Sequence, residues 1–171
     1  MATPSSCVTT APDDDRLHYG ASMDVGDVVE DFELPDETGT PRKLSDLLTN
    51  GPVVLFFYPA AMTTGCTRES CHFRDLSAEF AAVNGQRVGI SRDPVDKQHQ
   101  FSEKHGFDYP LLSDADGTVA TMMGVARKKG PPKRVTFVID QNRRVVAVVK
   151  SEIRMSVHAD RALDALKQLP R

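Results

Sequence analysis

Two kinds of hydrophobic pattern alternate along this chain, and each predicts a different secondary structure. Residues 53–58 form a continuous apolar run, Val-Val-Leu-Phe-Phe-Tyr, and residues 87–91 predict a second strand of the same kind. Such runs are typical of strands that are buried on both faces of a sheet. Residues 31–34 instead alternate between polar and apolar, and the turn-forming residues 36–40 follow them, so we expect a hairpin there.

The segment that begins at Cys66 has the period of a helix. With Cys66 placed at 0° and about 100° per residue, four large apolar residues fall between about 260° and 340° on the helical wheel. They are Phe73, Leu76, Phe80 and Val83. We expect one continuous helix, ended by Asn84 and Gly85 as a left-handed cap, with Cys66 facing inward and Cys71 on the polar side. Further helices are expected at 44–48, 96–105, 118–123 and 159–169, and further strands at 109–112, 135–140 and 145–150.

The order of these elements predicts the class of fold. Strands and helices alternate at first, as in parallel crossovers, and a hairpin followed by a helix ends the chain. We therefore expect an α/β domain with a central mixed β-sheet and helices on both faces. Cys66 would lie just beyond the carboxyl end of a buried strand, where such sheets place their binding and catalytic sites.

Composition agrees with one globular domain and excludes several classes of protein. The chain has 171 residues, 40% hydrophobic and 26% charged, with a formal net charge of −3. This charge gives no general attraction to nucleic acid or anionic membranes, and no apolar run approaches the roughly 18 residues that span a bilayer. We expect a folded domain at 23–171 and a flexible tail at 1–22, which is rich in Thr, Ser, Pro and Asp and contains Cys7. Because the tail lacks the apolar centre of a secretory signal, we expect a cytoplasmic protein whose thiols stay reduced.

Cys66 is the strongest candidate for a chemical role. It follows the buried strand and a short loop, and it stands where a helix begins. The unpaired backbone N–H groups and the positive dipole end of a helix start favour thiolate over thiol. Cys71 follows closely and gives an oxidised Cys66 a second thiol with which to react, so the pair predicts a redox site.

The spacing of the two cysteines predicts a conformational change. In an intact helix, residues at this spacing have Cα atoms roughly 8 to 9 Å apart, whereas a disulfide needs about 7 Å or less. Cys66 and Cys71 can therefore bond only if the first turns of the helix unwind. We expect unwinding to be easy, because the residues between them have little apolar surface to lose. These residues are Thr67, Arg68, Glu69 and Ser70.

The same residues allow other interpretations. A cysteine between a strand and a helix can be an inert buried side chain. Zinc is another alternative, with Cys66, Cys71 and His72 as ligands, although no second pair of closely spaced cysteines follows. A general dithiol oxidoreductase is a third, although that chemistry commonly uses a Cys-x-x-Cys pair. A redox-sensing or metal-delivery module is a fourth.

The sequence around Cys66 resembles the peroxiredoxins, in particular the bacterioferritin comigratory protein (PrxQ) subgroup. The active-site pattern Pro-x-x-x-Thr-x-x-Cys is present as Pro59, Thr63 and Cys66, and the subgroup's second cysteine is Cys71. The family usually has Pro after the motif Thr, and Thr64 replaces it here, so we expect a somewhat looser loop. The resemblance extends to segments 31–35, 111–114 and 134–140, and it runs from about residue 25 to residue 169.

This resemblance implies a thioredoxin fold of the peroxiredoxin type and a thiol peroxidase that serves antioxidant defence and redox homeostasis. Cys66 would attack the O–O bond of hydrogen peroxide or an organic hydroperoxide, and Cys71 would resolve the sulfenic acid as an intramolecular disulfide. Thr63 would orient the peroxide, Pro59 would shield the pocket, and Arg134 would stabilise the thiolate and the leaving oxygen. Thioredoxin or a similar dithiol would reduce the disulfide, with no cofactor or metal, and the subgroup is often monomeric, as we expect here. On the residues alone, Thr63 could simply cap a turn, and Arg134 could be a solvated neighbour of the basic segment 127–133.

Overall fold

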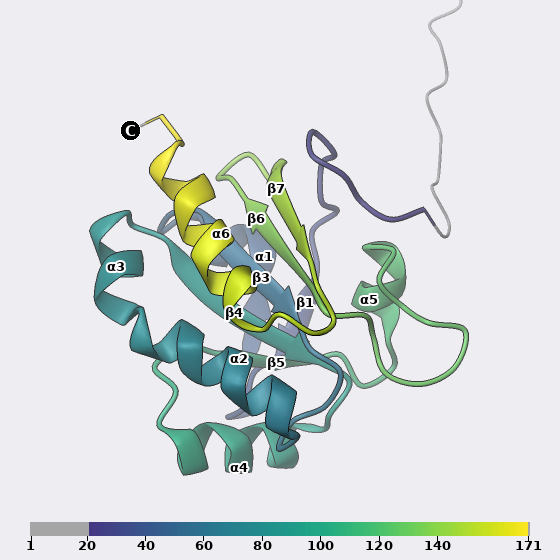
Figure 1. Ribbon diagram of the computed structural model, residues 1–171. Coiled ribbons are helices and arrows are strands. Elements are labelled where there is room, and N and C mark those ends of the chain that lie inside the picture. Colours follow the sequence, from purple (N-terminus) through teal and green to yellow (C-terminus); the bar gives the residue numbers. More distant parts are fainter. Residues whose placement is uncertain (1–20, 171) are drawn as a thin grey trace, which may run out of the picture.

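Five strands form one central mixed sheet with the order β5-β4-β3-β6-β7 (Figure 1). The computed structural model describes residues 21–170, so most of the expected tail, with Cys7, lies outside the described residues. The strands of the central sheet are β3 (Val53–Phe57), β4 (Gln86–Ser91), β5 (Leu111–Ser113), β6 (Val135–Ile139) and β7 (Val145–Lys150). Strand β3 pairs in parallel with β4, and β4 with β5, whereas β6 is antiparallel to both β3 and β7. The expected mixed sheet is therefore confirmed.

Six helices and one hairpin complete the described part of the chain. The helices are α1 (Leu44–Leu48), α2 (Thr64–Asp75), α3 (Ser77–Ala82), α4 (Val95–His105), α5 (Thr118–Met122) and α6 (Ser156–Lys167). The hairpin consists of β1 (Glu33–Pro35) and β2 (Pro41–Lys43), as its alternating pattern predicts. Among the described residues, no helix is both long enough and apolar enough to cross a bilayer.

Strand β3 is buried on both faces and divides the core into two clusters. Val53, Leu55 and Phe57 pack with apolar residues of α1 and α5 on one face. Residues 54, 56 and 58 pack on the other face with apolar residues of α2, α3, α4 and α6. In Figure 1, α2 and α6 lie in front of the sheet and α1 lies behind it. The uninterrupted apolar run arises because both faces need apolar side chains.

The helix expected to continue from Cys66 to Asn84 is broken at Leu76, so this prediction was wrong in one respect. Leu76 has φ −91° and ψ 20°, and it separates α2 from α3. The Arg87 guanidinium donates to the Phe73 carbonyl at 2.8 Å, which is the oxygen that an unbroken helix would offer to the Ser77 N–H. A side chain inserted into the helical ladder is a recognised cause of such a kink. The expected apolar stripe is nevertheless directed into the core, and Asn84 ends the segment at φ 55°.

The register of the sheet brings segments that are distant in sequence together at one end of the strands. Phe57, the last residue of β3, lies opposite Val135, the first residue of β6. The loop that leads to α2 therefore starts beside the residue that precedes β6, which is Arg134. Strand β4 also ends here, because it runs parallel to β3 and its Ile90 lies opposite Phe57.

Candidate active site

Cys66 is the third residue of α2 and is completely buried. It therefore lies within the first turn, where backbone N–H groups lack helical acceptors and the dipole favours a negative charge. The preceding Gly65 lies close to the side chains of Arg134 and Met155. A Cβ at position 65 would be 3.3 Å from Arg134 Nη2 and 3.2 Å from Met155 Cε, so the close approach favours glycine.

Arg134 supplies a positive charge to this buried site. Its Nη2 lies 3.4 Å from Cys66 Sγ, and its Nη1 donates to Glu69 Oε2. Burial alone would lower the pKa of Arg134, but the Glu69 carboxylate and then the Cys66 sulfur raise it above its ordinary value. Arg134 is only 6% exposed, so the interpretation as a solvated neighbour of the basic segment is wrong.

Glu69 belongs to this site as well, although neither the motif nor the family resemblance points to it. It is completely buried, as is Ser70, whose carbonyl accepts the Tyr109 hydroxyl at 2.6 Å. The residues between the two cysteines do have little apolar surface to lose, but the expectation of easy unwinding did not foresee that Glu69 and Ser70 are buried polar residues with partners of their own. Burial raises the pKa of Glu69 to about 7, against the opposing effect of Arg134. A signal existed, because Glu69 falls at about 300° on the helical wheel, within the apolar stripe.

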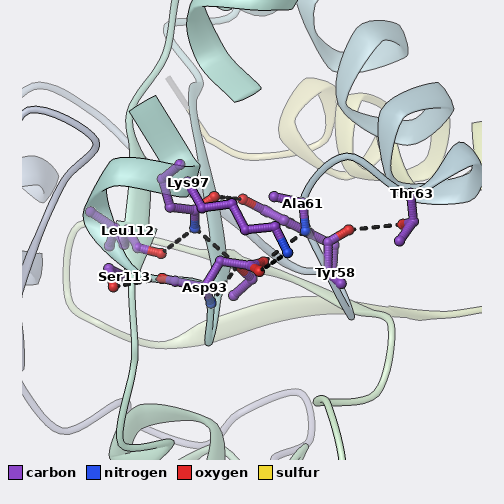
Figure 2. Close-up of polar contacts among 10 residues, drawn as sticks. Tyr58, Ala61, Thr63, Asp93, Lys97, Leu112 and Ser113 are labelled. Atoms are coloured by element: carbon purple, nitrogen blue, oxygen red, sulfur yellow. Dashed lines mark hydrogen bonds and ion pairs between the residues drawn. The ribbon is translucent and has the colours of Figure 1, made fainter. Parts of the chain in front are cut away.

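The loop between β3 and α2 is held by Asp93, which follows β4 (Figure 2). Asp93 Oδ2 accepts hydrogen bonds from the Ala61 backbone N–H and from the Ser91 hydroxyl, each at 2.7 Å. Its other oxygen lies 2.8 Å from Lys97 Nζ. One carboxylate thus fixes the backbone of the loop that leads to Cys66.

Thr63 and Met62 are the exposed residues of this loop. The Thr63 hydroxyl donates to the Ala60 carbonyl at 2.8 Å, as a residue that caps a turn would, and its oxygen lone pairs can still accept a hydrogen bond (Figure 2). Met62 has φ 70°, in the left-handed region, which costs a non-glycine residue roughly 1 to 2 kcal/mol. The loop conformation therefore depends on its hydrogen bonds. Pro59 begins the loop and is half-buried.

Cys71, unlike the completely buried Cys66, lies at the surface. It is half-buried and lines a cleft of about 480 Å³ together with Arg68, Ile153 and Met155. Burial raises the pKa of the Cys71 thiol, and Arg74 only partly opposes this effect. Both cysteines are free thiols within one helix.

Comparison with known proteins assigns this arrangement to a family. Residues 25–148 match the AhpC/TSA family. The chain belongs to this family and is a peroxiredoxin. A peroxiredoxin named Bcp from Bacillus subtilis is 34% identical over 155 residues, with 86% of this chain and 98% of the relative covered.

Solved structures agree with this assignment. The crystal structure of peroxidoxin BcpB from Mycobacterium tuberculosis matches with a TM-score of 0.85 and 61% identity, covering 87% of this chain and 99% of that one. A cysteine-to-serine variant of PrxQ from Xylella fastidiosa matches with a TM-score of 0.80 and 31% identity, covering 86% and 98%. The resemblance to the Bcp/PrxQ peroxiredoxins and the thioredoxin-like fold are thus confirmed, and membership implies a thiol peroxidase.

In this peroxiredoxin the structure brings some of the expected site residues together and leaves others apart. Arg134 contacts Cys66, whereas Cys71 opens onto the cleft described above and Thr63 bonds to its own loop. His72, one of the zinc ligands considered, lies 2.7 Å from Asp160 through its Nε2. Within residues 21–170, no group of three or more His, Cys, Asp or Glu side chains is arranged to hold a metal ion.

The Asp93→Ala variant tests how far the loop depends on its carboxylate anchor. The Ala61 N–H would lose its acceptor, and the strained loop that leads to Cys66 would drift from its present position. We expect the rate constant for peroxide to fall about tenfold, because misplacement of about an ångström can slow a reaction a hundredfold. Stopped-flow kinetics would measure it, with Asp96→Ala, an exposed residue of the same charge, as the control. Equal rates in both variants would show that Asp93 does not position the loop.

Proposed function

We propose that this peroxiredoxin reduces hydrogen peroxide and organic hydroperoxides with Cys66 as the attacking thiolate and Cys71 as the resolving thiol. The contact of Arg134 with the Cys66 sulfur is the observation that carries the proposal. In a buried site an arginine that is always charged favours thiolate over thiol. In the proposed reaction it would also stabilise the negative charge that develops on the leaving oxygen.

In the first step the Cys66 thiolate attacks one oxygen of the peroxide. A sulfur–oxygen bond forms, the O–O bond breaks, and the leaving alkoxide or hydroxide takes a proton to become an alcohol or water. Because Cys66 has no exposed surface, part of the surrounding structure must move before peroxide reaches the sulfur. In this proposal the exposed residues Met62, Thr63 and Thr64, which precede Cys66, would move. Thr63 would hold the peroxide with its free lone pairs, and half-buried Pro59 would keep water out.

In the second step Cys71 attacks the sulfur of the Cys66 sulfenic acid. A disulfide forms and the sulfenic oxygen leaves as water. Both cysteines lie within α2, so the helix must unwind between them first. Unwinding also removes the burial that raises the pKa of Cys71, so this thiol becomes more reactive once it is released.

A dithiol reductant of the thioredoxin class would close the cycle. It would donate two electrons to the Cys66–Cys71 disulfide and would itself become a disulfide. No metal or cofactor takes part in these steps, and we propose that the protein acts as a monomer in the cytoplasm.

A coupled assay tests this function. We expect the wild-type protein, thioredoxin and its reductase to oxidise one reduced nicotinamide cofactor for each hydroperoxide consumed. The rival activity, reduction of protein disulfides, is checked in the same buffer with insulin and no peroxide. Rapid insulin reduction without peroxide consumption would favour the general dithiol oxidoreductase instead.

A further inference from the structure

A third titratable side chain, which the steps above do not use, lies behind Arg134 and Glu69. His158, in α6, is completely buried. Its Nε2 is 2.8 Å from the Ser151 carbonyl oxygen, and its Nδ1 is 2.8 Å from the Thr136 hydroxyl. A carbonyl can only accept a hydrogen bond, so Nε2 carries a proton, and the ring is held from both sides.

The two oxygens of Glu69 are in unequal environments. Oε2 receives the Arg134 guanidinium, whereas Oε1 is buried and has no hydrogen-bond partner among the described residues. His158 Nδ1 lies 3.7 Å from this oxygen. A buried carboxylate oxygen without a donor is unfavourable, and a proton on Nδ1 would provide a positive charge at that distance.

The charge balance around the sulfur points to the same proton. When Cys66 is a thiolate, the single positive charge of Arg134 faces two negative groups, Cys66 and Glu69. The other charged groups near His158 are Glu152 after β7 and Arg161 on its own helix. One further proton on the His158 and Glu69 pair would make the net charge of the buried side chains Cys66, Glu69, Arg134 and His158 zero.

The pKa shifts of the two partners allow them to share this proton. Burial raises the pKa of Glu69 to about 7 and lowers the pKa of His158 below its ordinary value. Two such groups in contact titrate as a pair and not as independent residues.

We propose that His158 is a positioning residue for Cys66: while Cys66 is a thiolate, the Glu69–His158 pair holds one proton in addition to the proton on Nε2. This proton keeps Glu69, and through it Arg134, in place against the sulfur. Transfer of the Cys66 proton to the pair leaves the net charge of these buried side chains unchanged, so the thiolate persists to a lower pH than it would without the pair. The kinetic consequence rests on the proposed peroxidase function, whereas the coupled titration does not.

The first test uses a background in which Cys66 is the sole thiol, with Cys7→Ser and Cys71→Ser. In this background His158→Gln keeps an amide that can donate to Ser151 but does not titrate. The rate of alkylation by iodoacetamide, measured as a function of pH, gives the midpoint of thiolate formation. This midpoint should be about one pH unit higher in His158→Gln than in the same background with His158, which is a tenfold loss of thiolate below the midpoint. His99→Gln, an exposed histidine of α4, is the matched control and should leave the midpoint unchanged. The peroxide rate constant of His158→Gln should fall by a similar factor at pH values below the midpoint.

The reciprocal test needs no variant at position 158. By linkage, if the thiolate favours the proton on the pair, removing the thiolate must disfavour it to the same extent. The ¹⁵N resonances of the His158 ring should therefore titrate at lower pH in Cys66→Ser than in the reduced wild type.

The outcomes separate a positioning role from a structural one. Unchanged alkylation in His158→Gln, or identical His158 titrations with and without the Cys66 thiol, would overturn the proposal. A slow His158→Gln variant whose alkylation midpoint has not moved would also overturn it, since its role would then be packing alone. If both titrations shift but the wild type consumes no peroxide, the proposed peroxidase function fails and this coupling stands.

Discussion

The Cys71→Ser variant is expected to consume one equivalent of peroxide per chain and then stop, whereas Cys66→Ser is expected to consume none. Cys66 alone has the Arg134 guanidinium against its sulfur, and a serine hydroxyl in its place has no base to activate it. Without Cys71, the sulfenic acid forms but finds no internal thiol. A single-turnover experiment measures the loss of peroxide, and trapping with dimedone measures the sulfenic acid that forms on Cys66.

Thioredoxin-coupled turnover supplies the control for these variants. Cys7→Ser should behave as wild type, because Cys7 precedes the segment that matches the family. If Cys71→Ser recycled with thioredoxin at the wild-type rate, resolution within the chain would be wrong. In that case an external thiol would have to attack the Cys66 sulfenic acid directly.

The structure adds a condition to this cycle that helix geometry alone does not reveal. Unwinding the start of α2 must withdraw Glu69 from Arg134 and His158, and Ser70 from Tyr109. Amide hydrogen exchange between residues 66 and 74 is therefore expected to be slow in the reduced protein and faster in the disulfide form. The contacts of Glu69 with Arg134 and of Ser70 with Tyr109 must be broken before this turn unwinds, a cost that a solvated first turn would not have.

Some features of the site follow from local sequence and others do not. The burial of Cys66 at a helix start follows from the apolar run before it and from the period after it. The partnership with Arg134 depends on the pairing of Phe57 with Val135, which no local pattern encodes, and only the family resemblance pointed to it. The break at Leu76 likewise depends on a guanidinium that arrives from β4.

Glu69 lies between these two cases. Its position in an apolar stripe indicates a buried carboxylate, and a buried carboxylate requires a partner. Which residue is the partner is decided by tertiary structure, because Arg134 and His158 come from segments far along the chain. Local sequence can thus reveal that a buried charge exists, but not how it is balanced.

Arg134→Met is expected to lower the peroxide rate constant by about 10²- to 10³-fold, because it removes the guanidinium that lies 3.4 Å from the sulfur of the proposed nucleophile. It should also lower the free energy of unfolding at pH 8 by about 3 to 5 kcal/mol, because Glu69 remains buried without its counter-charge. Arg134→Lys keeps a charge but not the two-pronged geometry that reaches Glu69 and Cys66 together, so it should recover more stability than rate.

The pH dependence identifies Glu69 as the source of this instability. Burial already holds the pKa of Glu69 at about 7, above its ordinary value of 4.5, and the loss of Arg134 removes the effect that lowers it. The folded variant then binds a proton that the unfolded chain releases above about pH 4.5. Its stability should therefore fall as the pH rises from 5 to 8, as measured by urea unfolding at each pH. Adding Glu69→Gln should flatten this slope and restore stability. It should not restore the peroxide rate constant, because the positive charge of Arg134 is still missing. A double variant as unstable as Arg134→Met would show that the loss of stability comes from packing and not from an unpaired charge.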